Sequence, residues 1–106
     1  MLLRGLHKNI QRNVRLKSTY VAAIDQGTSS SRVILYDAET LAPRASHQID
    51  LTSATSTPSP GWAELNAGDI YRSVEESARG AMEKLNAKPS DIVGLGITNQ
   101  RESLCV

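Results

Sequence analysis

The chain alternates short apolar runs with polar connections, and its first runs predict strands. Residues 20–25, 32–37 and 44–51 are apolar, or alternate between apolar and polar positions, over strand lengths. The connections between them are short, so consecutive strands should pair antiparallel as a meander. Residues 52–61 are crowded with Ser, Thr and Pro and predict a surface loop without regular structure.

A helix is predicted next, with Asn66 as its N-cap. Asp69 stands three residues later, which completes a capping-box-like pair at the positive end of the helix. Asn86 and Pro89 should end it. Apolar residues between these ends form one helical stripe that should pack against the sheet. The stripe consists of Ile70, Val74, Ala78, Ala81 and Leu85.

Residues 92–98 are apolar throughout and predict a central strand covered on both faces. Gly94 and Gly96 within it indicate that a backbone or a ligand approaches closely. A meander, a crossover helix and a strand returning parallel to the first form the opening half of the α/β, ribonuclease H-like, actin-like fold. The returning strand should bring residues 99–102 to the sheet end that carries the turn after Asp25.

That turn combines residue types that suit a phosphate. Gly27 lets the backbone approach a ligand and adopt a positive φ, and successive N–H groups and hydroxyls of residues 28–31 can form an anion-binding concavity. Arg32 can hold a phosphate with its guanidinium fork, and Asp25 can hold Mg²⁺ through water beside it. The alternative is an ordinary hairpin turn, since Gly and Ser are common there and the P-loop spacing is absent.

Three motifs, in order, resemble the FGGY carbohydrate kinases of the actin, hexokinase and Hsp70-like ATPase superfamily. Residues 25–32, Asp-Gln-Gly-Thr-Ser-Ser-Ser-Arg, look like the phosphate-binding loop of that family. Residues 96–102, Gly-Ile-Thr-Asn-Gln-Arg-Glu, are similar to the glycerol-binding segment of its glycerol kinase branch. Pro-Gly-Trp-Ala-Glu at residues 60–64 also fits that branch. The resemblance covers Tyr20 to the last residue.

The resemblance implies ATP-dependent phosphorylation of glycerol to glycerol 3-phosphate, with Mg²⁺, within a longer enzyme. The residues that would contact the nucleotide phosphates are Thr28, Ser29, Ser30 and Arg32. Thr28 would also face the phosphate after transfer, and Asp25 would act around Mg²⁺. Catalysis of phosphoryl transfer depends largely on positioning and charge compensation, which such groups provide.

Arg101 and Glu102 would hold the glycerol hydroxyls. Glu102 can accept hydrogen bonds from hydroxyl groups, Arg101 can donate to their oxygens, and each steadies the charge of the other. Without the resemblance, the pair would be interpreted as a surface ion pair of small energetic value. Trp62, the only tryptophan, is expected to anchor its loop on the core; the alternative places it near the substrate.

Family members are several times longer, so residues 19–106 correspond to a truncated N-terminal FGGY domain. The catalytic base, an aspartate in the family, is expected beyond Val106, and no catalytic residue is assigned within the chain. We therefore expect the 106-residue chain alone to be inactive. Two alternatives stay open: another FGGY kinase acting on a pentulose or similar sugar, and a non-catalytic truncated fragment.

Residues 1–18 form a separate unit. They carry five Lys or Arg and no acid, whereas the rest carries seven basic against eleven acidic residues, for a net charge of +1. On a helix, Leu2, Leu3, Leu6, Ile10 and Val14 would fall on one side and four of the basic residues, Arg4, Lys8, Arg12 and Arg15, on the other. This pattern predicts a mitochondrial transit peptide, read by the import machinery, or a helix on an anionic membrane surface. A basic extension of a cytoplasmic protein is the alternative. The mildly acidic remainder argues against a nucleic-acid partner, one cysteine excludes an internal disulfide, and no pattern indicates an oligomeric state.

Overall fold

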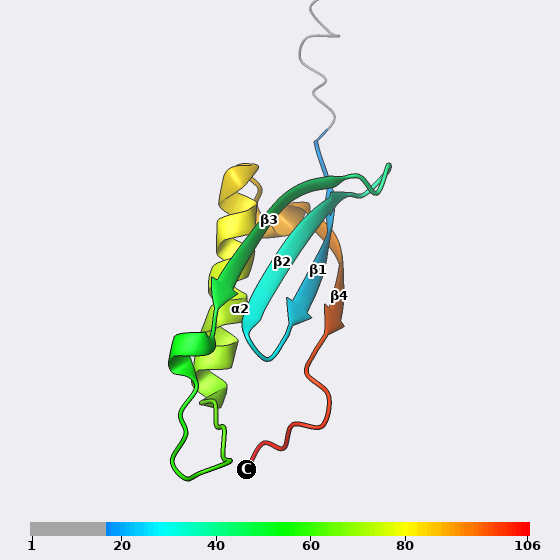
Figure 1. The fold of residues 1–106 in the computed structure, drawn as a ribbon. Helices are drawn as coiled ribbons and strands as arrows, with labels where there is room; N and C mark the ends of the chain where they lie inside the picture. Colours follow the sequence, from blue (N-terminus) through cyan, green and yellow to red (C-terminus); the bar gives the residue numbers. More distant parts are fainter. Residues whose placement is uncertain (1–16) are drawn as a thin grey trace, which may run out of the picture.

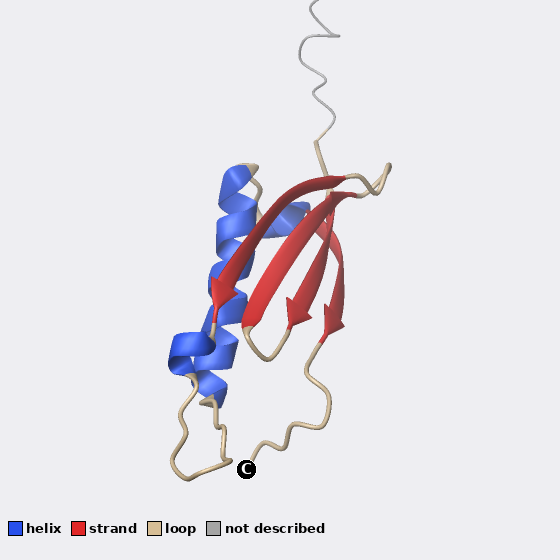
Figure 2. Ribbon diagram, in the orientation of Figure 1, coloured by secondary structure: helices blue, strands red, loops and turns tan. Residues whose placement is uncertain are grey.

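The computed structural model describes residues 17–106, which form a four-stranded sheet with one long helix across one face (Figure 1; Figure 2). The strands are β1 (Tyr20–Gln26), β2 (Ser30–Asp37), β3 (Pro43–Asp50) and β4 (Ile92–Thr98). The helices are α2 (Ala67–Lys84) and two 3-10 turns, η1 (Thr52–Ala54) and η2 (Pro89–Asp91). The predicted N-terminal unit of residues 1–18 lies outside the described residues except for its last two positions.

The strand order is β3-β2-β1-β4. β1 pairs antiparallel with β2 and parallel with β4, and β2 pairs antiparallel with β3. α2 lies between β3 and β4 in the chain and supplies the crossover that two parallel neighbours need. The predicted meander, crossover helix and parallel return are confirmed, and the sheet is the opening half of an α/β, ribonuclease H-like fold.

The ends of α2 follow local sequence signals. Asn66 is the N-cap, and its side-chain oxygen accepts a hydrogen bond from the N–H of Gly68 at 2.7 Å. The predicted capping-box partner is wrong, because the Asp69 carboxylate pairs with Arg72 instead. Asn86 adopts a φ of +49°, the left-handed conformation that commonly follows a helix end. Among the described residues, no helix is both long enough and apolar enough to cross a membrane.

The face of α2 that packs on the sheet combines two serines with the C-terminal half of the predicted apolar stripe. Its buried residues are Ser73, Ser77 and Ala81. Of the predicted stripe, Ala81 is fully buried and Ala78 and Leu85 pack against the core, whereas Ile70 and Val74 are only half-buried and are not part of it. The buried core between α2 and the sheet consists of Tyr20, Ala22, Val33, Leu35 and Ala81. Small side chains allow the helix backbone to lie close to β2 and β3.

Gly80 of α2 lies against the His47 side chain of β3. A Cβ atom added at Gly80 would stand 2.5 Å from both Cγ and Cδ2 of His47. Non-bonded heavy atoms do not come so close to a Cβ atom in real proteins. The His47 ring therefore occupies the space that a side chain at Gly80 would need. The helix therefore depends on glycine at this position for packing.

β4 is an edge strand within the described residues, which corrects the predicted central strand covered on both faces. Leu95 and Ile97 share a sheet face with Ala22 and Ile24 of β1 but are 59% and 68% exposed, because α2 lies over β2 and β3 instead. The predicted close approach at Gly96 is also wrong, since an added Cβ there would meet nothing within 4 Å.

The segment between β3 and α2 contains more regular structure than its composition predicts. η1 begins two residues after the end of β3, and Ser56 and Glu64 exchange both main-chain hydrogen bonds as an isolated bridge. The bridge closes the loop on itself rather than on the core. Trp62 is 59% exposed, so the prediction that it anchors the loop is wrong.

Asp91 joins the residues that precede β1 and β4. It is 7% exposed; its Oδ2 accepts from the Lys88 N–H at 2.9 Å, and its Oδ1 lies 2.9 Å from Lys17 Nζ. The Lys88 N–H and then the Lys17 ammonium hold the pKa of Asp91 below its ordinary value. The folded carboxyl therefore binds its proton at lower pH than the unfolded one, and ionisation stabilises the fold.

This contribution to stability is complete above the unfolded pKa of about 3.9 and is lost as the pH falls through the folded pKa. We expect Asp91→Asn to lower the thermal unfolding midpoint at pH 7. The difference in midpoint between the variant and the wild type should become smaller below about pH 4. Melts followed by circular dichroism at several pH values measure it, with Glu83→Gln on the exposed surface of α2 as the control. A gap that does not change with pH would contradict the assignment.

Candidate functional site

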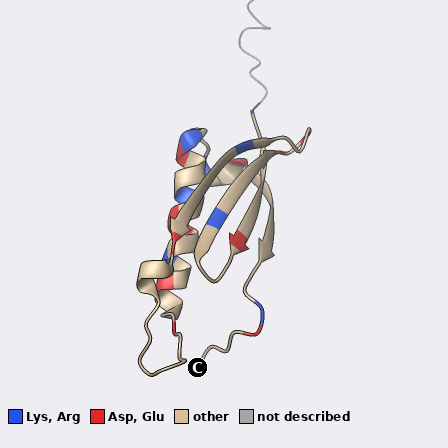
Figure 3. Ribbon diagram, viewed as in Figure 1, with Lys and Arg blue, Asp and Glu red and all other residues tan. Residues whose placement is uncertain are grey.

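The two segments with candidate site residues end at the same edge of the sheet. β1 and β4 run parallel, and Asp25 is in register with Thr98, so the turn after β1 and the segment after β4 leave the sheet side by side. The ribbon is coloured for an acidic residue at this end of β1, for a basic residue on neighbouring β2, and for both kinds in the segment beyond β4 (Figure 3). The predicted convergence of the two segments is confirmed.

The turn between β1 and β2 is held by main-chain hydrogen bonds. The Gly27 N–H donates to the Ser30 carbonyl at 2.8 Å, and the Leu51 N–H donates to the Ser29 carbonyl at 2.7 Å. Thr28 and Ser29 are exposed at the tip, and Ser30 is the first residue of β2. Gly27 does not adopt the positive φ that was predicted as an option. An added Cβ there would lie 3.4 Å from the Ser30 carbonyl oxygen, so the turn is tight.

Asp25 and Arg32 face each other across β1 and β2 on the sheet side away from α2. They are register partners, and Arg32 Nη2 lies 3.4 Å from Asp25 Oδ2. About half of each side chain is exposed, at 45% for Arg32 and 51% for Asp25. An ion pair so exposed contributes little to stability. Both groups therefore remain available to a ligand, the guanidinium to an anion and the carboxylate to a hydrated cation.

A second carboxylate lies at this end of the sheet but is engaged in its own turn. Asp50, the last residue of β3, is in register with Ser30. Its Oδ1 accepts from the Thr52 N–H at 2.6 Å, and the hydroxyl and N–H of Thr52 hold the pKa of Asp50 below its ordinary value. Asp50 thus shapes the start of the following loop, whereas the partner of Asp25 is the Arg32 side chain.

Arg101 and Glu102, in the segment after β4, are both exposed. Glu102 adopts a φ of +58°, a conformation that non-glycine residues adopt rarely and that recurs at functional sites. Neither side chain forms an ion pair within residues 17–106, so the predicted mutual charge compensation is absent. Beyond the β1–β4 pairing, no hydrogen bond or ion pair joins this segment to the turn after β1 within that range.

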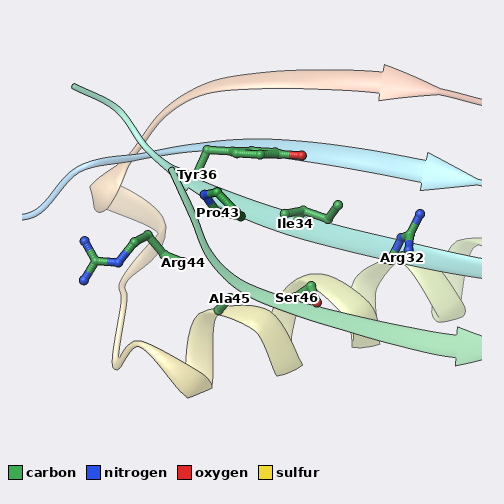
Figure 4. A pocket seen from close by; sticks show the side chains of 7 residues that line it. All are labelled: Arg32, Ile34, Tyr36, Pro43, Arg44, Ala45 and Ser46. Carbon is green, nitrogen blue, oxygen red and sulfur yellow. The ribbon is translucent and has the colours of Figure 1, made fainter. Parts of the chain in front are cut away.

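A hollow that the sequence did not reveal extends from Arg32 along the open face of the sheet. It is shallow, about 370 Å³ in volume, and Figure 4 shows Ile34 and the Tyr36 ring between Arg32 and Arg44. Its lining residues are Arg32, Ile34, Tyr36, Pro43, Arg44, Ala45 and Ser46. The alternation of Arg32, Ile34 and Tyr36 along β2 was the available signal, since every second residue of a strand shares a face.

Ser31 behaves differently from the hydroxyl residues before it. It is fully buried beneath α2, where its hydroxyl meets the Ser73 hydroxyl and its carbonyl meets the Ser77 hydroxyl. Residues 28–31 are one run of hydroxyl residues in the sequence. Because side chains alternate along a strand, Ser31 faces α2 and not the ligand side of the turn. Only the first three members of the run remain candidates for ligand contact.

The part of the chain that contains these candidate site residues is similar to known proteins. The family model for the N-terminal domain of the FGGY family of carbohydrate kinases matches residues 20–106. A glycerol kinase from Roseobacter denitrificans is 44% identical over 88 residues, covering 83% of this chain and 17% of the relative. A glycerol kinase from Enterococcus faecalis is 44% identical over 90 residues, with 82% and 17% covered.

Two solved structures have the same fold. The glycerol kinase of Plasmodium falciparum with ADP superposes with a TM-score of 0.66 at 26% identity, covering 81% of this chain and 17% of that one. A xylulose kinase from Brucella ovis superposes with a TM-score of 0.65 at 23% identity, covering 76% and 16%. The chain thus spans about a sixth of the length of the relatives that it matches.

Proposed function

The chain belongs to the FGGY family of carbohydrate kinases, and from this premise we propose that it is the first part of a longer enzyme that transfers a phosphoryl group from ATP to glycerol. The product is glycerol 3-phosphate. The observation that carries the proposal is the register of Asp25 with Thr98. Because of this register, the turn after β1 and the segment after β4 both begin at the same end of the sheet. Identity of 44% to glycerol kinases over most of the chain supports glycerol as the acceptor.

The turn after β1 is the part that contacts the nucleotide. Thr28, Ser29 and Ser30 offer hydroxyls and main-chain N–H groups to the phosphates, and Thr28 also faces the phosphate after transfer. Arg32 compensates the phosphate charge once its guanidinium moves from Asp25, and a 3.4 Å pair that is half exposed opposes this movement little. Positioning and charge compensation supply most of the catalysis in phosphoryl transfer.

Asp25 fits a role beside Mg²⁺. This ion usually keeps several waters and binds through one or two carboxylates together with substrate phosphates. Asp25 offers one half-exposed carboxylate next to the turn, whereas Asp50 is occupied by Thr52. The metal would neutralise charge on the nucleotide phosphates, and the part of Asp25 is to hold its water shell near the turn.

Arg101 and Glu102 bind the acceptor. Glycerol presents only hydroxyl groups, each of which donates and accepts one or more hydrogen bonds. An exposed carboxylate and guanidinium on neighbouring residues satisfy both roles, and hydrogen bonds to charged groups are the strong ones. Because these residues follow β4 directly, the acceptor hydroxyl would lie beside the turn that binds the phosphates.

The test is turnover by the longer protein that begins with this chain. We expect ATP-dependent formation of glycerol 3-phosphate, with kcat/KM for glycerol exceeding that for ribulose, and no turnover by the purified 106-residue chain, which spans about a sixth of its relatives. Preferential turnover of ribulose would favour a pentulose kinase. Glycerol 3-phosphate made by the short chain, free of host kinase, would contradict the assignment of the base beyond Val106.

We also propose that residues 1–18 direct the protein to mitochondria. Five basic residues and no acid support this proposal, because on a helical projection of the sequence four of the five fall opposite the apolar residues. A fluorescent protein fused after residues 1–18 should localise to mitochondria, and the same fusion with Arg4, Lys8, Arg12 and Arg15 changed to Gln should not. A diffuse cytosolic signal from the unchanged fusion would refute the proposal and favour a cytoplasmic enzyme.

A further inference from the structure

Two hydroxyls of α2 bind one residue of β2. The Ser73 hydroxyl donates to the Ile70 carbonyl of its own helix at 2.7 Å and accepts from the Ser31 hydroxyl at 2.8 Å, and the Ser77 hydroxyl donates to the Ser31 carbonyl at 3.0 Å. All three serines are buried, with exposures of 3% for Ser73 and 0% for Ser31 and Ser77. The contacts with Ser31 join positions 42 and 46 residues apart in the chain. They hold a strand against a helix at one defined point.

Packing alone does not require these hydroxyls. Ala81 occupies the next turn of the same helix face and is also 0% exposed, so a methyl group fills this contact where no hydroxyl is needed. Buried hydroxyls are costly unless they are hydrogen-bonded, and fully satisfied buried polar contacts fix one arrangement of the chain. On the buried face of α2, the serines Ser73 and Ser77 occupy the two turns that lie against the start of β2.

That point of β2 lies between two candidate phosphate ligands. Ser31 faces α2, so its neighbours Ser30 and Arg32 face the other side of the sheet. The Ser30 carbonyl accepts the hydrogen bond from Gly27 that closes the turn. A displacement of Ser31 along or away from the helix would therefore move both the turn and the Arg32 guanidinium.

We propose that Ser73 and Ser77 are positioning residues for phosphate binding, which anchor Ser31 and thereby set where the β1–β2 turn and Arg32 meet the nucleotide phosphates. The inference rests on the proposed function. Neither serine touches substrate, since both are covered by the sheet. Ligand groups held by such a supporting layer bind more tightly because less order is lost on binding.

Kinetics of the longer enzyme test the functional half of this proposal. We expect Ser77→Ala to raise KM for ATP about tenfold, because binding must then order a turn that this hydrogen bond already holds in the wild type, and to leave KM for glycerol within about twofold of the wild type. Ser73→Ala, which leaves the carbonyl bond of Ser31 intact, should act in the same direction but less. Ser90→Ala, an exposed serine of η2, is the matched control and should change neither constant. Equal changes in both KM values, or no change, would overturn the proposal.

Hydrogen exchange of the 106-residue chain tests the structural half without turnover. The amides of Gly27 and Leu51 report on the turn, because they donate to Ser30 and Ser29. Ser77→Ala should make both exchange several-fold faster, with unchanged exchange for the amides between β1 and β4. Uniform acceleration would show general destabilisation and overturn the proposal. Absence of glycerol phosphorylation by the wild-type enzyme would refute the proposed function, and the exchange result would still decide whether these serines hold the turn.

Discussion

Glu102→Gln in the longer enzyme is expected to lower kcat/KM for glycerol by about 10- to 100-fold, which corresponds to a charge-assisted hydrogen bond of about 1.5–3 kcal/mol. Glutamine has nearly the shape of glutamate but carries no charge, so the change isolates the carboxylate. The Glu102 side chain is free of ion pairs within the described range and exposed beyond β4. KM for ATP should stay within about twofold, because the nucleotide binds at the other segment.

Glu83→Gln is the matched control for this prediction. Glu83 is exposed near the C-terminal end of α2, at the end of the molecule where β4 begins, whereas the candidate site lies where β4 ends. The control should alter neither kinetic constant. If Glu102→Gln behaves like this control, Glu102 does not bind the acceptor, and the correspondence with the glycerol-binding segment fails at that residue.

Gly80→Ala is expected to destabilise the chain by about 1–2 kcal/mol, although alanine is intrinsically better than glycine in a helix by about 1 kcal/mol. The added methyl would stand 2.5 Å from the His47 ring atoms Cγ and Cδ2. Cγ is the ring atom next to the His47 Cβ, so it is close to the β3 backbone and moves little when the side chain rotates. The ring can avoid the methyl group only by leaving the contact between α2 and β3. Overlap of this kind costs more than the helix preference returns.

The same substitution should change sign when the ring is removed. In a His47→Ala background, Gly80→Ala no longer meets the ring and is expected to raise the free energy of unfolding by about 0.5–1 kcal/mol through helix preference. Thermal and urea unfolding of the four proteins in the cycle measure the coupling. Equal effects of Gly80→Ala in both backgrounds would show that the His47 contact does not control this position.

Local pattern was sufficient for the elements and their order. Tyr20–Gln26 and Ile92–Thr98 are strands, and Asn66 caps a helix that ends at Lys84, just before the left-handed Asn86, because period, caps and turn residues act over a few neighbouring positions. The common sheet edge for Asp25 and the residues after Thr98 follows from a parallel return. The roles of these residues in binding remain predictions.

Burial was predicted less well, because it depends on which other segments are present. Ile92–Thr98 is apolar throughout, but Leu95 and Ile97 lie where α2 does not reach. Trp62 is apolar enough for a core, yet the Ser56–Glu64 bridge turns its loop inward on itself. Hydrophobicity measures a preference for burial, and the neighbours decide whether the preference is met.

By itself the sequence determined the order of strands and helix, the end of the sheet at which the acid, the hydroxyls and the Arg–Glu pair gather, and the family to which the chain belongs. These depend on neighbours in the chain and on motifs of contiguous residues. Only the tertiary structure decided that Ser31 is buried while Thr28, Ser29 and Arg32 face outward, that Ser73 and Ser77 rather than Ile70 and Val74 face the sheet, and that Gly80 adjoins His47. These contacts join residues more than 30 positions apart, and their geometry is set by the distance at which α2 packs on the sheet.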